Sequence, residues 1–138
     1  METEYKIITL PSPDWDVIGG GISDFNAQQA GDDSGTYICF AVQSPEGETV
    51  GGVIGVIHYA WLMIQLMYLP EDLRGQGYGS RLLALAEDEA RQRGAAHAYL
   101  DTFSFQAPEF YKKQGYSVFG ELPDFPKGHT RYFMKKDL

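Results

Sequence analysis

The sequence predicts one α+β domain built on a mixed, mostly antiparallel sheet. The chain has 138 residues, of which 43% are apolar and 14% aromatic, enough for one hydrophobic core and too many for intrinsic disorder. Strand-like segments separated by short turns dominate before residue 70, as in an antiparallel meander. After Arg74 the apolar residues take helical spacing. Because no linker or repeat divides the chain, residues 1–138 are expected to form a single domain.

The first 31 residues are expected to contain one strand and two helical pieces. Tyr5 to Leu10 has strand-like composition and is followed by prolines. Asp14 is a candidate cap for a short helix, which we expect Gly19-Gly20-Gly21 to interrupt. A second helical piece over residues 22–30 then ends at Gly31.

The central part of the chain is predicted to form three strands. Thr36 to Gln43 is the first, and Pro45-Glu46-Gly47-Glu48 forms a turn into an uncharged stretch of 22 residues, Thr49 to Pro70. This stretch is long enough to span a bilayer. However, it contains three glycines, two polar side chains and many β-branched residues, and no basic cluster flanks it. We therefore expect two buried strands that turn near His58-Tyr59-Ala60, and no membrane partner.

A long amphipathic helix is expected after the uncharged stretch. Its apolar face comprises Leu82, Leu83, Leu85, Ala86 and Ala90, and the helix stops at Gly94. The i,i+4 pairs Glu87/Arg91 and Glu89/Arg93 are assigned to its solvent-exposed side. Strands over residues 97–101, 116–120 and 130–136 follow, with a short helix from Pro108 through Lys113 between the first two.

Charge and cysteine content narrow the classes of partner. The net charge of −8 argues against nucleic-acid binding and favours a cationic partner. Cys39 is the single cysteine, which excludes a disulfide framework and a cysteine-based metal site, and no metal is expected. The N-terminal residues show no basic region followed by an apolar core, so a cytoplasmic protein is expected.

The segment Arg74-Gly75-Gln76-Gly77-Tyr78-Gly79-Ser80 carries the clearest functional signal. A buried strand leads into this glycine-rich turn, which opens directly into the amphipathic helix. Glycines allow close backbone approach, and a helix N-terminus offers unpaired N–H groups and a favourable dipole to an anion. A tight turn with no ligand is the plainer interpretation, but the three glycines and the preceding arginine favour a pyrophosphate site.

Two common nucleotide-binding patterns do not fit this loop. The dinucleotide fingerprint G-x-G-x-x-G needs one more residue than Gly75-x-Gly77-x-Gly79 provides, and too little chain follows for two βαβαβ halves. The GK[ST] ending of a triphosphate-binding loop is also absent. Binding of a dinucleotide is therefore the less favoured hypothesis, which a cofactor-binding experiment can test.

Two motifs resemble the GNAT superfamily of N-acetyltransferases. Arg74-x-x-Gly77-x-Gly79 fits the family's Arg-x-x-Gly-x-Gly signature, and residues 107–116, Ala-Pro-Glu-Phe-Tyr-Lys-Lys-Gln-Gly-Tyr, fit its A-x-x-[FL]-Y-x-x-x-G-[FY] helix. The order of predicted elements is also the family's. The resemblance implies a mixed, mostly antiparallel sheet of six to seven strands with helices on both faces, and acetyl-CoA as co-substrate.

The resemblance also implies roles for individual residues. Backbone groups of Met67, Tyr68 and Leu69 would pair with the pantetheine arm of acetyl-CoA. The pyrophosphate would be held by a set of seven residues: Arg74, Gly75, Gln76, Gly77, Tyr78, Gly79 and Ser80. Tyr111 occupies the family's general-acid position, although a buried aromatic role would also explain it. Ser104 stands where relatives often carry an Asn that contacts the coenzyme, and Gln106 is the candidate replacement.

The general base and the acceptor are less well specified. Gln65 occupies the strand position where many relatives carry Glu, so Asp101, His58 and His129 are the candidate bases, with Asp101 preferred. The expected acceptor is a primary amine of a small, cationic molecule, and aromatic candidates for its pocket are Trp61, Phe103, Phe105, Phe125 and Tyr132. The alternative is a catalytically silent acyl-CoA-binding regulatory module. A homodimer is possible in such a family.

Overall fold

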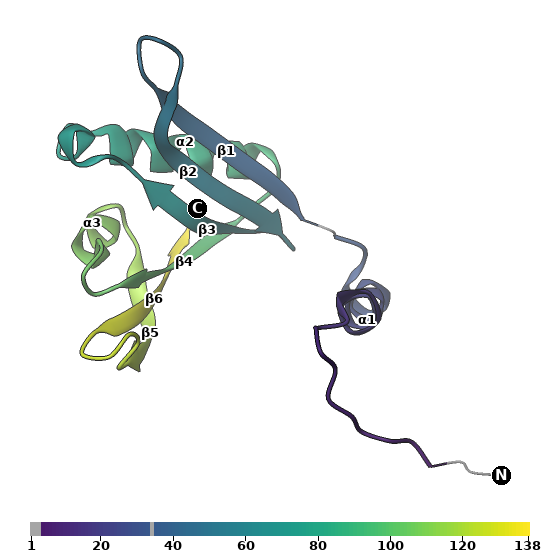
Figure 1. The fold of residues 1–138 in the computed structure, drawn as a ribbon. Helices are drawn as coiled ribbons and strands as arrows, with labels where there is room; N and C mark the ends of the chain where they lie inside the picture. The colour runs from purple at the N-terminus through teal and green to yellow at the C-terminus, as the bar shows by residue number, and fades with distance from the viewer. Residues whose placement is uncertain (1–3, 34) are drawn as a thin grey trace. The chain divides into compact units, whose positions relative to one another are not determined.

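Six strands form one mixed sheet in the order β1-β2-β3-β4-β6-β5 (Figure 1). The computed structural model describes residues 4–33 and 35–138, and the sheet lies in the second of these segments. The strands are β1 (Thr36–Gln43), β2 (Thr49–His58), β3 (Trp61–Tyr68), β4 (His97–Phe103), β5 (Ser117–Pro123) and β6 (Thr130–Asp137). Only β3 and β4 pair in parallel; all other neighbours are antiparallel. The predicted mixed, mostly antiparallel sheet is confirmed.

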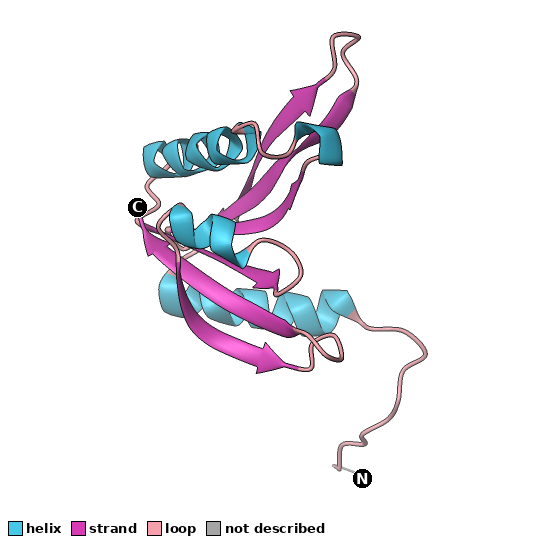
Figure 2. Ribbon diagram, turned by 90° about the vertical axis from the view of Figure 1, so that its left-hand side faces the viewer, coloured by secondary structure: helices cyan, strands magenta, loops and turns pink. Residues whose placement is uncertain are grey.

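Two helices pack on one face of this sheet (Figure 2). Helix α2 (Tyr78–Gln92) contacts β1, β2 and β3, and α3 (Pro108–Lys113) follows β4. Alternate strand residues point toward the helices, and the fully buried ones include Val53, Leu62, Leu100 and Met134. This alternation with period two is what one buried face of a sheet requires.

The N-terminal residues form a separate compact unit that ends at Asp33. A π-helical turn η1 (Trp15–Gly19) runs directly into α1 (Gly20–Ala30). Asp14 caps it as predicted, since its side chain accepts a hydrogen bond from the Val17 N–H at 3.0 Å. The predicted interruption at the three glycines is wrong. Glycine lowers helix propensity by only about 1 kcal/mol and still adopts helical angles, as Gly20 does.

The predicted strand at residues 5–10 is also wrong. These residues form no strand, although their composition suits one. A strand exists only when a neighbouring strand satisfies its backbone groups, and local composition cannot supply that neighbour. Because the chain divides at Asp33, the single domain over residues 1–138 stays a prediction. In the part of the chain that the structure describes, no helix combines the length and hydrophobicity needed to cross a membrane.

Two residues of α2 lie on a different side of the helix from the one predicted. Glu87 is not on the solvent side but buried, where it accepts hydrogen bonds from the Tyr116 hydroxyl at 2.8 Å and from Lys136 Nζ at 2.7 Å. Conversely, Leu85 is 48% exposed and lies outside the buried face. The pair Glu89–Arg93 is on the surface as expected, at 2.9 Å. A buried carboxylate needs partners from other elements, which helical periodicity does not reveal.

Two buried tyrosines lead us to expect that the folded protein becomes less stable at high pH. Burial raises the pKa of Tyr111, and burial together with the charge of Glu87 raises the pKa of Tyr116. The unfolded chain therefore loses these protons near pH 10 while the folded chain keeps them. Above pH 10 the free energy of unfolding should fall by up to about 1.4 kcal/mol per pH unit for each tyrosine. Urea unfolding between pH 8 and 11 measures this slope, and Tyr116→Phe should make it shallower.

Candidate active site

The strands β3 and β4 separate from each other where the candidate site begins. Their parallel pairing covers only Trp61–Ile64 with His97–Leu100, although both strands continue further. Gln65 is the extra residue of a β-bulge in β3, because Ile54 pairs with Leu66 while Gly55 pairs with Ile64. A bulge bends its strand and ends regular pairing. The later part of β3 therefore presents unpaired backbone groups toward β4.

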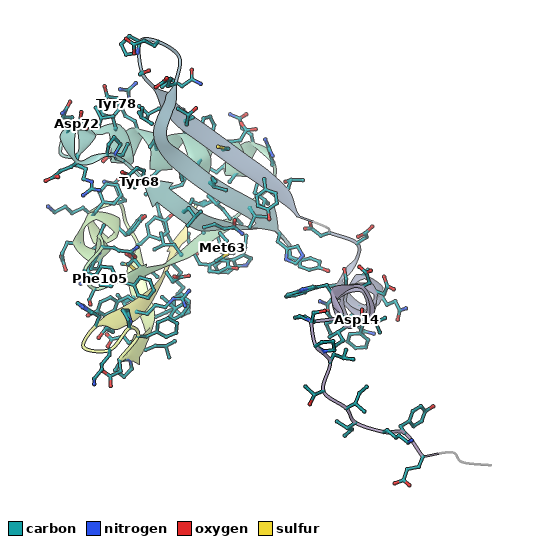
Figure 3. The ribbon with its side chains drawn as sticks, in the orientation of Figure 1. Asp14, Met63, Tyr68, Asp72, Tyr78 and Phe105 are labelled. Atoms are coloured by element: carbon teal, nitrogen blue, oxygen red, sulfur yellow. The ribbon has the colours of Figure 1, made fainter. Side chains whose placement is uncertain are left out.

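Two cavities meet in this gap. One, of about 420 Å³, is lined by the end of β3, by Asp101 and Thr102 of β4, and by the following loop. The other, of about 480 Å³, is lined by the glycine loop and α3. Their shared walls are Met67, Leu69, Arg74, Ala107 and Tyr111. Figure 3 shows Tyr68 at the end of β3, Tyr78 at the start of α2 and Phe105 in the loop after β4.

The three loop glycines have two different roles. Gly75 and Gly77 have φ angles of +74° and +89°. Residues with a side chain rarely adopt such angles, so both positions favour glycine because of the backbone conformation. A Cβ atom at either position would meet nothing within 4 Å, so open space lies beside the loop. Gly79 is helical, and its Cβ would lie 3.2 Å from the Phe110 ring. Gly79 thus allows α2 and α3 to pack closely.

The start of α2 has the properties of an anion site. The first intrahelical bond runs from the Arg81 N–H to the Gly77 carbonyl, and no side chain caps the preceding N–H groups in the described structure. Such N–H groups and the helix dipole favour an anion. Arg74 lies beside them, with its Nε donating to the Leu69 carbonyl at 2.9 Å, which leaves its terminal nitrogens available. This arrangement fits the pyrophosphate of a coenzyme.

Of the remaining loop side chains, Gln76 and Tyr78 line neither cavity, whereas Ser80 lines the second. Gln76 donates to the carbonyl of Asp72 at 2.7 Å, and the Tyr78 ring lies under the Arg81 guanidinium, with 5.6 Å between its centroid and the guanidinium carbon. Ser80 lines the second cavity, and its hydroxyl accepts a hydrogen bond from Gln114 at 3.1 Å. Gln76 and Tyr78 can therefore contribute backbone N–H groups here, while their side chains stabilise the loop.

Tyr111 lies where the two cavities meet. Helix α3 holds it, and its ring packs edge-on against Phe110 and Tyr116. Its hydroxyl makes no hydrogen bond with any residue that the structure describes, and it is not among the fully buried polar atoms, so it faces the cavity. Burial raises the pKa of Tyr111 above its ordinary value. The phenol is therefore protonated at neutral pH and can donate a proton.

Of the candidate bases, the structure brings only Asp101 to the site. Its carboxylate lines the first cavity, together with Gln65. His58 lies in the β2–β3 turn, with its ring 4.3 Å from the ring of Tyr59. His129 packs edge-on against Phe105 at 4.8 Å, outside the lining of either cavity. Asp101 therefore stays the preferred candidate, on position alone.

Ser104 is held in a structural contact, whereas Gln106 lines the candidate site. Ser104 is held by Thr130, whose N–H donates to the Ser104 hydroxyl at 3.0 Å and whose carbonyl accepts from the Ser104 N–H at 2.7 Å. Gln106 lines the first cavity, and its Oε1 accepts from the Phe103 N–H at 2.8 Å. Its amide NH₂ has no acceptor among the described residues. Gln106 is therefore placed to donate to a ligand carbonyl.

Sequence reasoning missed one charged residue beside the site. Arg131 of β6 binds Asp101 through Nε at 2.9 Å and Nη2 at 2.8 Å. Only the register of β4 against β6 brings them together. Of the aromatic candidates for the acceptor pocket, Phe105 lines the cavity, whereas Trp61 stacks on His97 at 4.5 Å.

The sequence matches the Acetyltransferase (GNAT) family over residues 5–116. The chain belongs to the GNAT acetyltransferases. It is 38% identical to a blasticidin-S acetyltransferase from Streptomyces morookaense over 104 residues, which are 75% of this chain and 74% of the relative. A streptothricin acetyltransferase from Streptomyces lavendulae is 30% identical over 107 residues, covering 74% of this chain and 54% of the relative.

Solved structures confirm the GNAT fold. The crystal structure of an acetyltransferase from Bacillus cereus superimposes with a TM-score of 0.90 at 36% identity, covering 96% of this chain and 98% of the other. This GNAT protein is thus an acyltransferase, and its family uses acetyl-CoA as the acetyl donor. The anion site at the start of α2 and the open edge of β3 suit that donor.

Proposed function

We propose that this GNAT protein transfers the acetyl group of acetyl-CoA to a primary amine of a small, cationic acceptor. The observation that carries the proposal is the junction of the two cavities at Tyr111. The cavity on the glycine-loop side suits the coenzyme, and the cavity beside Asp101 suits the acceptor. A hydroxyl at their junction lies next to both reactants.

The donor side is assigned to three groups of residues. The N–H groups of residues 75–80 and the Arg74 guanidinium would hold the pyrophosphate. Backbone groups of Met67, Tyr68 and Leu69 that face the gap would pair with the pantetheine arm, as the separation of β3 from β4 permits. The amide NH₂ of Gln106 would donate to a pantetheine carbonyl in place of the asparagine that Ser104 replaces.

The reaction needs three contributions from the protein. When bound, acetyl-CoA supplies an acetyl group activated as a thioester. A backbone N–H at the end of β3 would donate to the carbonyl oxygen as negative charge develops there. The amine must lose its proton to become nucleophilic, and Asp101 is the candidate acceptor of that proton. Tyr111, whose phenol stays protonated because burial raises its pKa, would donate its proton to the departing sulfur.

The proposed class of acceptor is supported by the net charge of the protein and by the names of two relatives. Two relatives are named for acetylation of the antibiotics blasticidin S and streptothricin. The net charge of −8 favours approach of a cationic acceptor. We therefore propose small cationic amines, antibiotics among them, as the acceptors.

A two-stage assay tests this function. Acetyl-CoA should raise the melting temperature, whereas NAD should not. CoA should then be released when a panel of small cationic amines, including blasticidin S, is added. A thermal shift without CoA release from any amine would instead support a silent acyl-CoA-binding module. Stabilisation by NAD alone would contradict the assignment of the coenzyme.

Arg74 provides a direct test of the anion site. Replacing it with glutamine removes the charge beside the α2 N-terminus, so the KM for acetyl-CoA should rise by about tenfold, equivalent to about 1.4 kcal/mol. The acceptor KM should change little. Arg81→Gln is the matched control, since its guanidinium lies over the Tyr78 ring and lines neither cavity. Equal effects of the two substitutions would contradict the role of Arg74.

A further inference from the structure

We propose that Asp101, held in place by Arg131, is the acceptor-binding group, and that it recognises a cationic nitrogen attached to a flat apolar group. This inference rests on the proposed function and names the chemistry of its acceptor. Asp101 touches the substrate in this proposal, whereas Arg131 is a positioning residue that acts through Asp101.

Only one of the two carboxylate oxygens of Asp101 has hydrogen-bond partners among the described residues. Both Arg131 nitrogens bind the same oxygen, Oδ1, at 2.9 and 2.8 Å. The other oxygen, Oδ2, has no hydrogen-bond partner among the described residues. A carboxylate has about four acceptor sites, so Oδ2 keeps its capacity to bind a donor. Because Asp101 lines the first cavity and its side chain is 22% exposed, a ligand can reach it.

Arg131 is itself fixed by aromatic rings. Its guanidinium carbon lies 4.8 Å from the Phe125 ring centroid, 5.2 Å from that of Phe133 and 5.6 Å from that of Phe103. Cation–π contacts of this kind hold a guanidinium in one orientation. Because Asp101 pairs with Phe133, and Phe103 with Arg131, all four side chains lie on one face of the β4–β6 ladder. This packing keeps the Asp101 carboxylate in one position at the cavity wall.

A flat apolar surface lies in the same cavity. Phe105 is 56% exposed and lines the cavity, and its ring is stacked on Phe103 at 5.3 Å with an interplanar angle of 6°. His129 supports it edge-on at 4.8 Å. Phe105 is thus held as a rigid platform that can stack on a flat group or lie beside a cation.

The charges of this cavity assign the cation to Asp101. Among the described residues that line it, only Arg74 and Asp101 carry charge. Arg74 sits at the glycine loop, where the anionic coenzyme is expected, and would repel a cationic acceptor. Asp101 is the anionic group in the lining, and although Arg131 balances its charge, its free Oδ2 can accept a charge-assisted hydrogen bond from an ammonium or guanidinium group.

A matched pair of ligands tests the subsite. The ligands are 4-methylbenzylamine and 4-methylbenzyl alcohol, which share a ring and differ in that only the amine carries a cationic nitrogen. Calorimetric titration of the CoA-saturated protein should show at least tenfold tighter binding of the amine. In Asp101→Asn this preference should fall below threefold. Equal affinities in the wild type, an unchanged preference in the variant, or no binding of either ligand would overturn the proposal.

Further variants separate recognition from a structural ion pair. Arg131→Gln should reduce the preference for the amine over the alcohol and Arg131→Lys should restore part of it, whereas a purely structural role would alter unfolding and leave the preference unchanged. Glu89→Gln, which breaks the surface pair with Arg93, is the matched control and should have no effect on the preference. All variants should bind CoA like the wild type. If the wild type does not bind CoA, the proposed function fails; CoA binding without a preference for the amine overturns only this subsite.

Discussion

Replacement of Tyr111 with phenylalanine is expected to lower kcat by about 100-fold or more. General acid catalysis contributes about 10²–10⁴ in rate, and this change removes only the hydroxyl that would protonate the departing sulfur. The ring packing against Phe110 and Tyr116 is retained, so the fold and the affinity for acetyl-CoA should change little. Steady-state kinetics and calorimetric titration with CoA measure the two quantities separately.

Tyr116 offers the matched control for this experiment. Its ring centroid is 6.0 Å from that of Tyr111, but its hydroxyl binds Glu87 and lines neither cavity. Tyr116→Phe should therefore lower stability by about 1–3 kcal/mol and leave kcat within about threefold of the wild type. If Tyr111→Phe kept normal kcat with the identified acceptor, the proton would have to come from another group or from water.

Replacement of Glu87 with alanine should cost about 3–5 kcal/mol of stability. The Glu87 side chain is 5% exposed and its partner Lys136 is 22% exposed, so removal of the carboxylate leaves a largely buried ammonium group without its anion. The Tyr116 hydroxyl also loses its acceptor. Since domains of this size are stable by about 5–15 kcal/mol, the loss should be plain in urea unfolding at pH 7.

Glu89→Ala on the same helix is the control for this change. Glu89 forms an exposed i,i+4 pair with Arg93, and such pairs contribute at most about 1 kcal/mol. A loss in Glu87→Ala no larger than in Glu89→Ala would show that the buried network contributes nothing beyond a surface pair. A milder variant, Glu87→Gln, keeps the volume and an acceptor for Tyr116 and should cost less than the alanine change.

Local patterns in the sequence predicted the conformation of the glycine-rich segment and of α3 well. The strand, glycine turn and helix from Leu69 to Gln92 are continuous in the chain, so the loop conformation depends on nearby residues. Gly75 and Gly77 have the positive φ angles that such a turn favours, and the motif around Tyr111 placed α3 correctly. The same reasoning failed for Tyr5 to Leu10, where a strand-like composition has no pairing partner.

The sequence by itself determined the family, the order of most elements and the glycine-rich turn before α2, because each depends on residues that are close together in the chain. The tertiary structure alone revealed the pairing of Asp101 with Arg131, the burial of Glu87 and the gap between β3 and β4. These features depend on strand register and on contacts between distant segments, such as Glu87 with Lys136. No local pattern encodes which residues face one another across a sheet, so these contacts became visible only in the folded chain.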